Sequence, residues 1–247
     1  MKKQNVGLLV LPLLLMVMSF NNEQLPESFA IIELFTSQGC SSCPQADKLL
    51  SQTIANAKKD GKKIMALSFH VDYWNRLGWL DPFSEKKYSQ LQRDYASALH
   101  LSNVYTPQMI VNGTTEFVGS NNNELTNALE RSLHTTPAAA FKMLTATFQV
   151  GAPPLVKYEL ERAVPGCKLH FALVSLNETT YVKHGENGGL ILKSENVVRQ
   201  FISAPISVKG QIQFDVSPIP EKNNLAIVAY IQQEDLKIIG ASMAVIN

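Results

Sequence analysis

The sequence predicts a mixed α/β fold in which buried strands alternate with amphipathic helices, followed by an antiparallel β-sandwich. Two apolar runs, 29–35 and 64–71, lack period-two alternation, which is typical of parallel strands buried on both faces. A helical pattern separates these runs, and this order predicts a right-handed βαβ unit. From residue 137 onward apolar and polar residues alternate and turn residues recur, which predicts about seven antiparallel strands.

Apolar spacing predicts the first two helices. The helix between the two apolar runs is expected to stop at Gly61, and its apolar face consists of Ala46, Leu49, Leu50, Ile54 and Ala57. A second helix is expected to begin with Asp81 as N-cap and Pro82 at its first position. The inner face of this helix carries Tyr88, Leu91, Tyr95 and Leu99.

The remaining elements follow from shorter patterns. Residues 109–112 and 116–118 predict a hairpin, and residues 123–133 predict a last helix with a leucine at every fourth position. In the second half, apolar residues alternate with charged ones at Val156, Tyr158 and Leu160. Cys167 begins a strand whose inward residues alternate, so we expect a buried free thiol there; a resolving role is the alternative.

Composition excludes some partners and leaves the domain count open. The chain has 247 residues, which suits one large domain or two ordinary ones, with 45% hydrophobic and 17% charged residues. The formal net charge is +1, so nothing points to nucleic acid as a partner.

The N-terminus has the layout of a secretory signal peptide. Lys2 and Lys3 precede an almost uncharged apolar run over 6–20, and a polar segment follows. The run is short for a bilayer span of about 20 residues, although an uncleaved anchor remains the alternative. We therefore expect residues 1–23 to be removed, with no stable membrane span afterwards and a secreted or periplasmic mature protein, where thiols can form disulfides.

Two of the three cysteines, Cys40 and Cys43, form a CxxC motif between the first strand and the first helix. Unpaired backbone N–H groups at a helix start stabilise a thiolate at Cys40, and Cys43 is close enough to close a disulfide. A structural disulfide is one alternative. Half of a zinc site is another, but no second pair of ligands with similar spacing is present.

Thr106 and Pro107 precede the predicted hairpin. This arrangement resembles the cis-proline loop of the thioredoxin fold, whose residues lie beside the CxxC motif and pair with an incoming peptide. The alternative is that Pro107 is an ordinary trans proline at the first position of an edge strand.

The chain is similar to one secreted thioredoxin-like family, domain of unknown function 1223. The similarity lies in "IIELFTSQGCSSCPQAD" (31–47), "HVDYWNRLGWLDPF" (70–83), "YTPQMIVNG" (105–113), "HGENGG" and "ENVVRQF". The resemblance implies a thioredoxin-like domain over 24–136, with an inserted helical loop at about 72–100, and a β-sandwich domain over 137–247. It implies no established substrate.

Several residues depart from ordinary thioredoxins. Ser41 and Ser42 stand between the cysteines, and Gly39 occupies the position of an expected aromatic residue, so the redox potential is left open. Glu33 is the candidate proton acceptor for the second thiol, but it lies one residue too far from Cys40. In a strand this offset turns a side chain to the other face unless a bulge absorbs it, and a paired or solvated carboxylate is the alternative.

The segment after the second apolar run carries further candidates. Tyr73, Trp74 and Trp79 could form an apolar wall for a peptide, or simply attach an insertion to the core. His70 could poise a proton or bind a metal with the thiols, or be satisfied by a neighbour. The glycine-rich turn at 184–189 could dock on the first half through its Glu and Asn, or be ordinary surface turn chemistry.

These observations predict an exported thiol–disulfide oxidoreductase without a cofactor that acts on protein or peptide thiols and disulfides. Cys40 would attack, Cys43 would resolve the mixed disulfide, and Thr106 and Pro107 would position the substrate. Two alternatives stay open: a non-catalytic binding or scaffold protein with a structural disulfide, and a periplasmic copper handler with Cys40, Cys43 and His70 as ligands.

Overall fold

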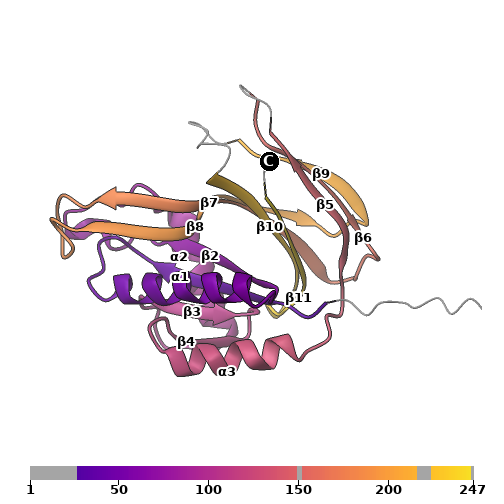
Figure 1. The fold of residues 1–247 in the computed structure, drawn as a ribbon, viewed down its shortest axis with the longest axis horizontal. Coiled ribbons are helices and arrows are strands. Elements are labelled where there is room, and N and C mark those ends of the chain that lie inside the picture. Colours follow the sequence, from indigo (N-terminus) through magenta and orange to yellow (C-terminus); the bar gives the residue numbers. More distant parts are fainter. Residues whose placement is uncertain (1–26, 149–151, 216–223, 246–247) are drawn as a thin grey trace, which may run out of the picture.

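The structure is a computed structural model that describes residues 27–148, 152–215 and 224–245 (Figure 1). The predicted signal peptide, 1–23, lies outside the described residues. No helix in the described ranges is long and apolar enough to cross a membrane.

One large, mostly antiparallel sheet and a second, smaller sheet form the fold, which confirms the mixed α/β class. The large sheet has the strand order β11-β10-β7-β8-β2-β1-β3-β4. Its strands are β1 (Ala30–Thr36), β2 (Ile64–His70), β3 (Gln108–Val111), β4 (Thr115–Val118), β7 (Cys167–Tyr181), β8 (Ile191–Pro205), β10 (Leu225–Gln233) and β11 (Ile238–Val245). The smaller sheet contains β5 (Phe141–Thr147), β6 (Leu155–Leu160) and β9 (Lys209–Gln213).

The first half forms the predicted elements around β1. Helix α1 (Cys43–Lys59) connects β1 to its parallel neighbour β2, so the parallel pair with a helix between is confirmed. β3 pairs antiparallel with β1 and, as the predicted hairpin, with β4. The predicted last helix is α3 (Asn122–Leu133), whose N-cap Asn121 accepts a hydrogen bond from the Glu124 backbone N–H.

Side chains on β1 alternate between two hydrophobic cores, because successive residues of a strand point to opposite faces. Ile32 and Leu34 pack with α1 and α3 on one face. Ile31 and Phe35 pack on the other face with Tyr95 of helix α2 (Lys86–Ala98). The face on which a β1 side chain lies therefore decides whether it can approach the helix that carries Cys43.

The described residues of the second half form seven strands, and four of them extend the sheet of the first half. The junction is the parallel pairing of β8 with β2 at Ser68 and Val197. The other three strands form the smaller sheet, and a core that includes Val156, Tyr158, Leu169, Phe171 and Ile227 lies between the two layers (Figure 1). Cys167 lies in this core as a buried free thiol, as expected.

The predicted start of the second helix is wrong. Helix α2 begins at Lys86 after N-cap Glu85, five residues beyond Asp81. The Asp81 carboxylate instead accepts hydrogen bonds from the backbone N–H groups of Gln38 and Phe83, at 2.8 and 3.0 Å. A tertiary contact thus uses the side chain that the local pattern assigned to capping.

Candidate active site at Cys40 and Cys43

The CxxC motif lies where the sequence predicts it, between the end of β1 and the start of α1. Cys40 and Cys43 are joined by a disulfide, and their Cα atoms are 5.4 Å apart. Cys43 is the first residue of α1, and its backbone N–H donates to the Cys40 carbonyl at 3.2 Å. Neither cysteine has exposed surface, so a reagent reaches the sulfur atoms only after the residues that cover them move.

Thr106 and Pro107 lie beside the disulfide, and the peptide bond between them is cis, as the resemblance to the cis-proline loop implies. The Cys40 Sγ is 3.8 Å from the Thr106 carbonyl oxygen. The Thr106 hydroxyl accepts a hydrogen bond from Trp74 Nε1 at 2.7 Å. Segments more than sixty residues apart in the chain thus meet at one sulfur atom.

The three aromatic candidates of the inserted segment, Tyr73, Trp74 and Trp79, are half-buried and hydrogen-bonded within the protein. A Cβ atom at Gly39 would lie 3.3 Å from the Trp74 Cβ, and Trp79 Nε1 donates to Gln38 Oε1 at 3.1 Å, so both tryptophans border the loop that carries Cys40. Tyr73 instead donates to Gln92 of α2 at 3.2 Å. The structure therefore brings two of the three predicted aromatic residues to the cysteine loop.

Glu33 is not brought to the cysteines. Its carboxylate accepts hydrogen bonds from Tyr95 and Tyr230, at 2.5 and 3.1 Å, on the face of the sheet opposite α1. Burial raises the pKa of Glu33 to about 7, and the two tyrosines oppose that shift. The one-residue offset turns this side chain to the wrong face for a proton transfer to Cys43.

Asp47 is the carboxylate on the side of the cysteines, and it was not predicted. It follows Cys43 by four residues on α1, so the two side chains share one helix face. The Thr36 hydroxyl donates to the half-buried Asp47 carboxylate at 3.3 Å. Burial raises the pKa of Asp47 to about 7, against a smaller opposing effect of His70. The i, i+4 spacing from Cys43 was the signal in the sequence.

His70 forms a buried ion pair at the end of β2. Its Nδ1 is 2.7 Å from Asp81 Oδ2, and both side chains are inaccessible to solvent. Burial opposes protonation of His70, but the carboxylates of Asp81 and Asp47 outweigh it and raise the pKa of the ring. His70 Nε2 is buried without a hydrogen-bond partner among the described residues.

The copper alternative gains no support from this arrangement. Among the residues that the structure describes, no three His, Cys, Asp or Glu side chains are grouped so as to hold a metal ion.

The glycine-rich turn between β7 and β8 docks on the cysteine loop. Asn187 donates from Nδ2 to the carbonyl oxygens of Gln38 and Cys40, both at 2.9 Å. The Glu186 carboxylate accepts from the Ser41 backbone N–H at 3.0 Å. The β7–β8 hairpin of the second half thereby covers the disulfide of the first half.

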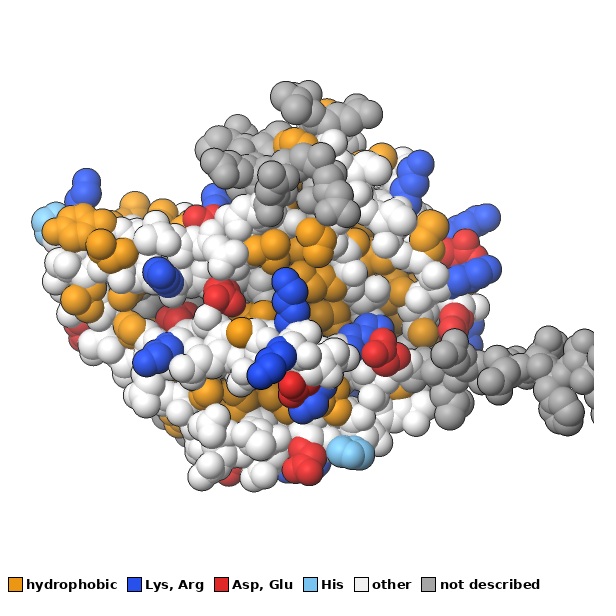
Figure 2. All heavy atoms as spheres, viewed as in Figure 1, with side chains coloured by type: hydrophobic (Ala, Val, Ile, Leu, Met, Phe, Trp, Pro, Cys, Tyr) orange, Lys and Arg blue, Asp and Glu red, His pale blue; other side chains and the backbone are white. Residues whose placement is uncertain are grey.

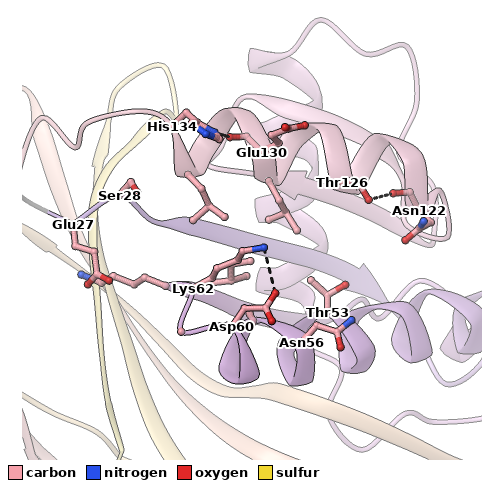
Figure 3. A pocket seen from close by; sticks show the side chains of 16 residues that line it. Glu27, Ser28, Thr53, Asn56, Asp60, Lys62, Asn122, Thr126, Glu130 and His134 are labelled. Carbon is pink, nitrogen blue, oxygen red and sulfur yellow. Dashed lines mark hydrogen bonds and ion pairs between the residues drawn. The ribbon is translucent and has the colours of Figure 1, made fainter.

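Two hollows border α1 at opposite ends. A groove of about 470 Å³ lies between the start of α1 and the β7–β8 hairpin, and Asp47, Lys48, Glu178 and Lys193 line it. A cavity of about 760 Å³ lies between the end of α1 and α3, where Asn56, Asp60, Lys62 and Glu130 surround it (Figure 3). Only the groove is next to the cysteine pair.

Comparison with known proteins identifies the family. The family described as "Protein of unknown function (DUF1223)" matches residues 31–232. The X-ray crystal structure of a protein from Agrobacterium tumefaciens, a target of the Northeast Structural Genomics Consortium, is similar at 25% sequence identity and a TM-score of 0.67. The match covers 90% of this chain and 96% of the Agrobacterium chain. No curated protein matches. The family match spans most of the chain, including the CxxC motif and the docked turn, so this protein belongs to the DUF1223 family.

Proposed function

We propose that this protein is an exported thiol–disulfide oxidoreductase whose first half is thioredoxin-like and whose second half is a β-sandwich that shares its large sheet. The observation that carries the proposal is the Cys40–Cys43 disulfide at the start of α1, with the Thr106 carbonyl 3.8 Å from the Cys40 sulfur. The helix start favours a thiolate, and the Thr106 segment supplies a backbone for an extended peptide to pair with.

In the reducing direction, the Cys40 thiolate attacks one sulfur of a substrate disulfide. The substrate S–S bond breaks, and the leaving sulfur takes its electron pair. Cys43 then loses its proton and attacks Cys40, which forms the Cys40–Cys43 disulfide and releases the second substrate thiolate. The substrate has gained two electrons and the protein pair has lost two. In the reverse direction the oxidised pair accepts two electrons from a dithiol.

Asp47 is the group we assign as proton acceptor for Cys43. It lies one helical turn beyond Cys43, and its pKa, raised by burial to about 7, matches a proton acceptor near neutral pH. The sequence had offered Glu33, which lies on the other face of the sheet. In this mechanism the thiol proton moves to Asp47 and then to solvent through the adjoining groove.

Protein substrates fit this site better than small thiols alone. Leu80, Tyr181 and Ile191 are 75%, 58% and 68% exposed. Tyr181 and Ile191 flank the turn of the β7–β8 hairpin, and Figure 2 shows hydrophobic side chains gathered on the surface at this end of the molecule. Exposed apolar patches of this kind mark protein contact sites.

Asp47→Asn should slow the resolution of a mixed disulfide at Cys40 by about a hundredfold at pH 7, because general base catalysis typically contributes that much or more. In the parent protein the rate should rise with pH through about 7, as Asp47 loses its proton. Stopped-flow release of a chromophoric thiol from a Cys40 mixed disulfide measures both quantities. Asp94→Asn, on the exposed part of α2, is the matched control. An Asp47→Asn profile that overlays the control would remove Asp47 from the mechanism.

A scaffold protein with a structural disulfide is the second candidate, because neither cysteine is exposed. Redox titration against glutathione separates the two candidates. An exchange protein equilibrates with the buffer and keeps its fold, whereas a structural disulfide resists reduction until the protein unfolds.

A further inference from the structure

The outer part of the β7–β8 hairpin is a two-stranded ribbon. β10 pairs with β7 only between Cys167 and Ser175, and β2 pairs with β8 only at Val197. Beyond these points, residues 177–181 pair only with 191–195 among the described strands, and Figure 1 shows this part extending past the sheet. An isolated two-stranded hairpin is marginally stable in water, so the stability of the ribbon depends on its contacts with other parts of the protein.

The ribbon touches the loop that leads into Cys40. Gln38 Nε2 donates to Thr180 Oγ1 at 2.9 Å, and the nearly buried Asn187 amide bridges two carbonyl oxygens of the loop. Close packing accompanies these bonds, because a Cβ atom at Gly185 would lie 3.2 Å from the Trp79 Cβ. Opening the path to the sulfur of Cys40 at this side therefore requires Asn187 to release the loop.

Glu186 places a negative charge beside the same cysteine. Its carboxylate accepts a hydrogen bond from the backbone N–H of Ser41, the residue that follows Cys40. Hydrogen bonding to the Ser41 side chain and backbone lowers the pKa of Glu186, which keeps it ionised. A like charge nearby disfavours a thiolate at Cys40.

The other charged groups around the loop do not cancel this effect. Asp47 on α1 and Asp81, bonded to the Gln38 N–H, add negative charge, and His70 on β2 is the positive partner of Asp81. Lys48 and Lys193 in the adjoining groove are matched there by Glu178 and Glu195. The summed charge of all these groups with Glu186 is negative, so removal of the Glu186 charge should favour a thiolate at Cys40.

We propose that the turn at the tip of the β7–β8 ribbon restrains the nucleophile Cys40. Asn187 keeps this turn bound over the cysteine loop, and Glu186 disfavours the Cys40 thiolate. This inference rests on the proposed exchange function, in which Cys40 is the attacking thiol. Destabilising the thiolate destabilises the reduced pair, so Glu186 also makes the pair more reducing. Glu186 and Asn187 are positioning residues, since they act through Cys40 and its loop.

The test measures the alkylation rate of Cys40 by iodoacetamide from pH 4 to pH 10, in reduced full-length mature protein that carries Cys43→Ser. Glu186→Gln keeps the hydrogen bond to Ser41 and removes the charge. The midpoint of the pH profile should fall by about 0.5 to 1 pH unit. Below the midpoint this shift corresponds to an alkylation rate about threefold to tenfold higher, and the plateau rate at high pH should be unchanged. Glu195→Gln is the matched control, because it removes a ribbon carboxylate that bonds Ser51 on α1 instead.

Asn187→Ala should raise the alkylation plateau by about tenfold without moving the midpoint, since two hydrogen bonds to the loop are lost. Cys167 reports global unfolding, because it is buried in the other core. Faster alkylation of Cys40 at an unchanged Cys167 rate supports a local cover. Equal acceleration of both thiols, or no acceleration of Cys40, overturns it.

The outcomes separate this inference from the proposed function. A Glu186→Gln midpoint equal to that of Glu195→Gln overturns the charge effect even where the parent protein exchanges disulfides. A shifted midpoint in a protein that exchanges no disulfides supports the restraint and ends the exchange function.

Discussion

Cys43→Ser is expected to convert the protein into a trap for its substrate, whereas Cys40→Ser abolishes exchange. With Cys40 as nucleophile and serine at 43, a mixed disulfide forms but no second thiol resolves it. Serine at 40 cannot form the mixed disulfide at all, so the rate should fall to the uncatalysed one. Non-reducing electrophoresis with a model peptide that contains a disulfide, followed by mass spectrometry of the Cys40 adduct, measures both results.

Cys167→Ala is the control for this pair of substitutions. Cys167 is buried in the core between the two sheets, so its replacement should leave the exchange rate unchanged. An adduct on Cys43 in the Cys40→Ser variant, at the rate of the parent protein, would reverse the assigned roles. Absence of any adduct would instead favour the scaffold candidate.

The size of the ring that the disulfide closes weighs against a purely structural role. The cysteines are three positions apart, and so short a loop gains only about 2 kcal/mol in the chain-entropy account. A chain with three hydrophobic cores does not need that contribution to fold. A short disulfide at a helix start is better suited to opening and closing than to holding distant segments together.

Local pattern was sufficient for the elements that carry the cysteines. The apolar runs, the helix between them and the hairpin after Pro107 depend on periodicity and turn residues, which neighbouring residues encode. The same reasoning failed at Asp81, whose N-cap signature is real but whose carboxylate is used by Gln38, more than forty residues away in the chain. Capping signals are local, and a tertiary contact can override them.

Long-range contacts decide what the sequence left open about the site, including whether Glu186 and Asn187 dock on the first half. The parallel contact of Ser68 with Val197 brings the second half beside β2, and this placement lets Asn187 and Glu186 reach the cysteine loop. Nothing in the spacing of either segment encodes that pairing. Asp47 was missed for a different reason, because a single carboxylate on an amphipathic helix has the pattern of a solvated residue until its neighbours are known.

Glu33→Gln is expected to stabilise the protein at neutral and alkaline pH. Burial raises the pKa of Glu33 to about 7 in the folded state, from 4.5 in the unfolded chain. A raised pKa means that the folded state binds the proton more tightly. The contribution of Glu33 is therefore fully present below about pH 4.5, declines as pH rises to about 7 and is absent above that. The difference of about 2.5 pH units corresponds to about 3 kcal/mol in the free energy of unfolding.

Glutamine mimics the protonated acid, since its amide can exchange hydrogen bonds with Tyr95 and Tyr230 without a charge to bury. The free energy of unfolding can be measured by urea unfolding followed by circular dichroism at pH 4.5, 6 and 8. Relative to the parent protein, that of the variant should increase as pH rises, by up to about 3 kcal/mol at pH 8. Asp47→Asn is the comparison, because burial raises the pKa of Asp47 in the same direction on the other face of the sheet. A Glu33→Gln difference that stays constant with pH would show that the pKa of Glu33 is the same in the folded and the unfolded state. In that case the two tyrosine hydroxyl groups, which donate to its carboxylate, stabilise the charge against burial.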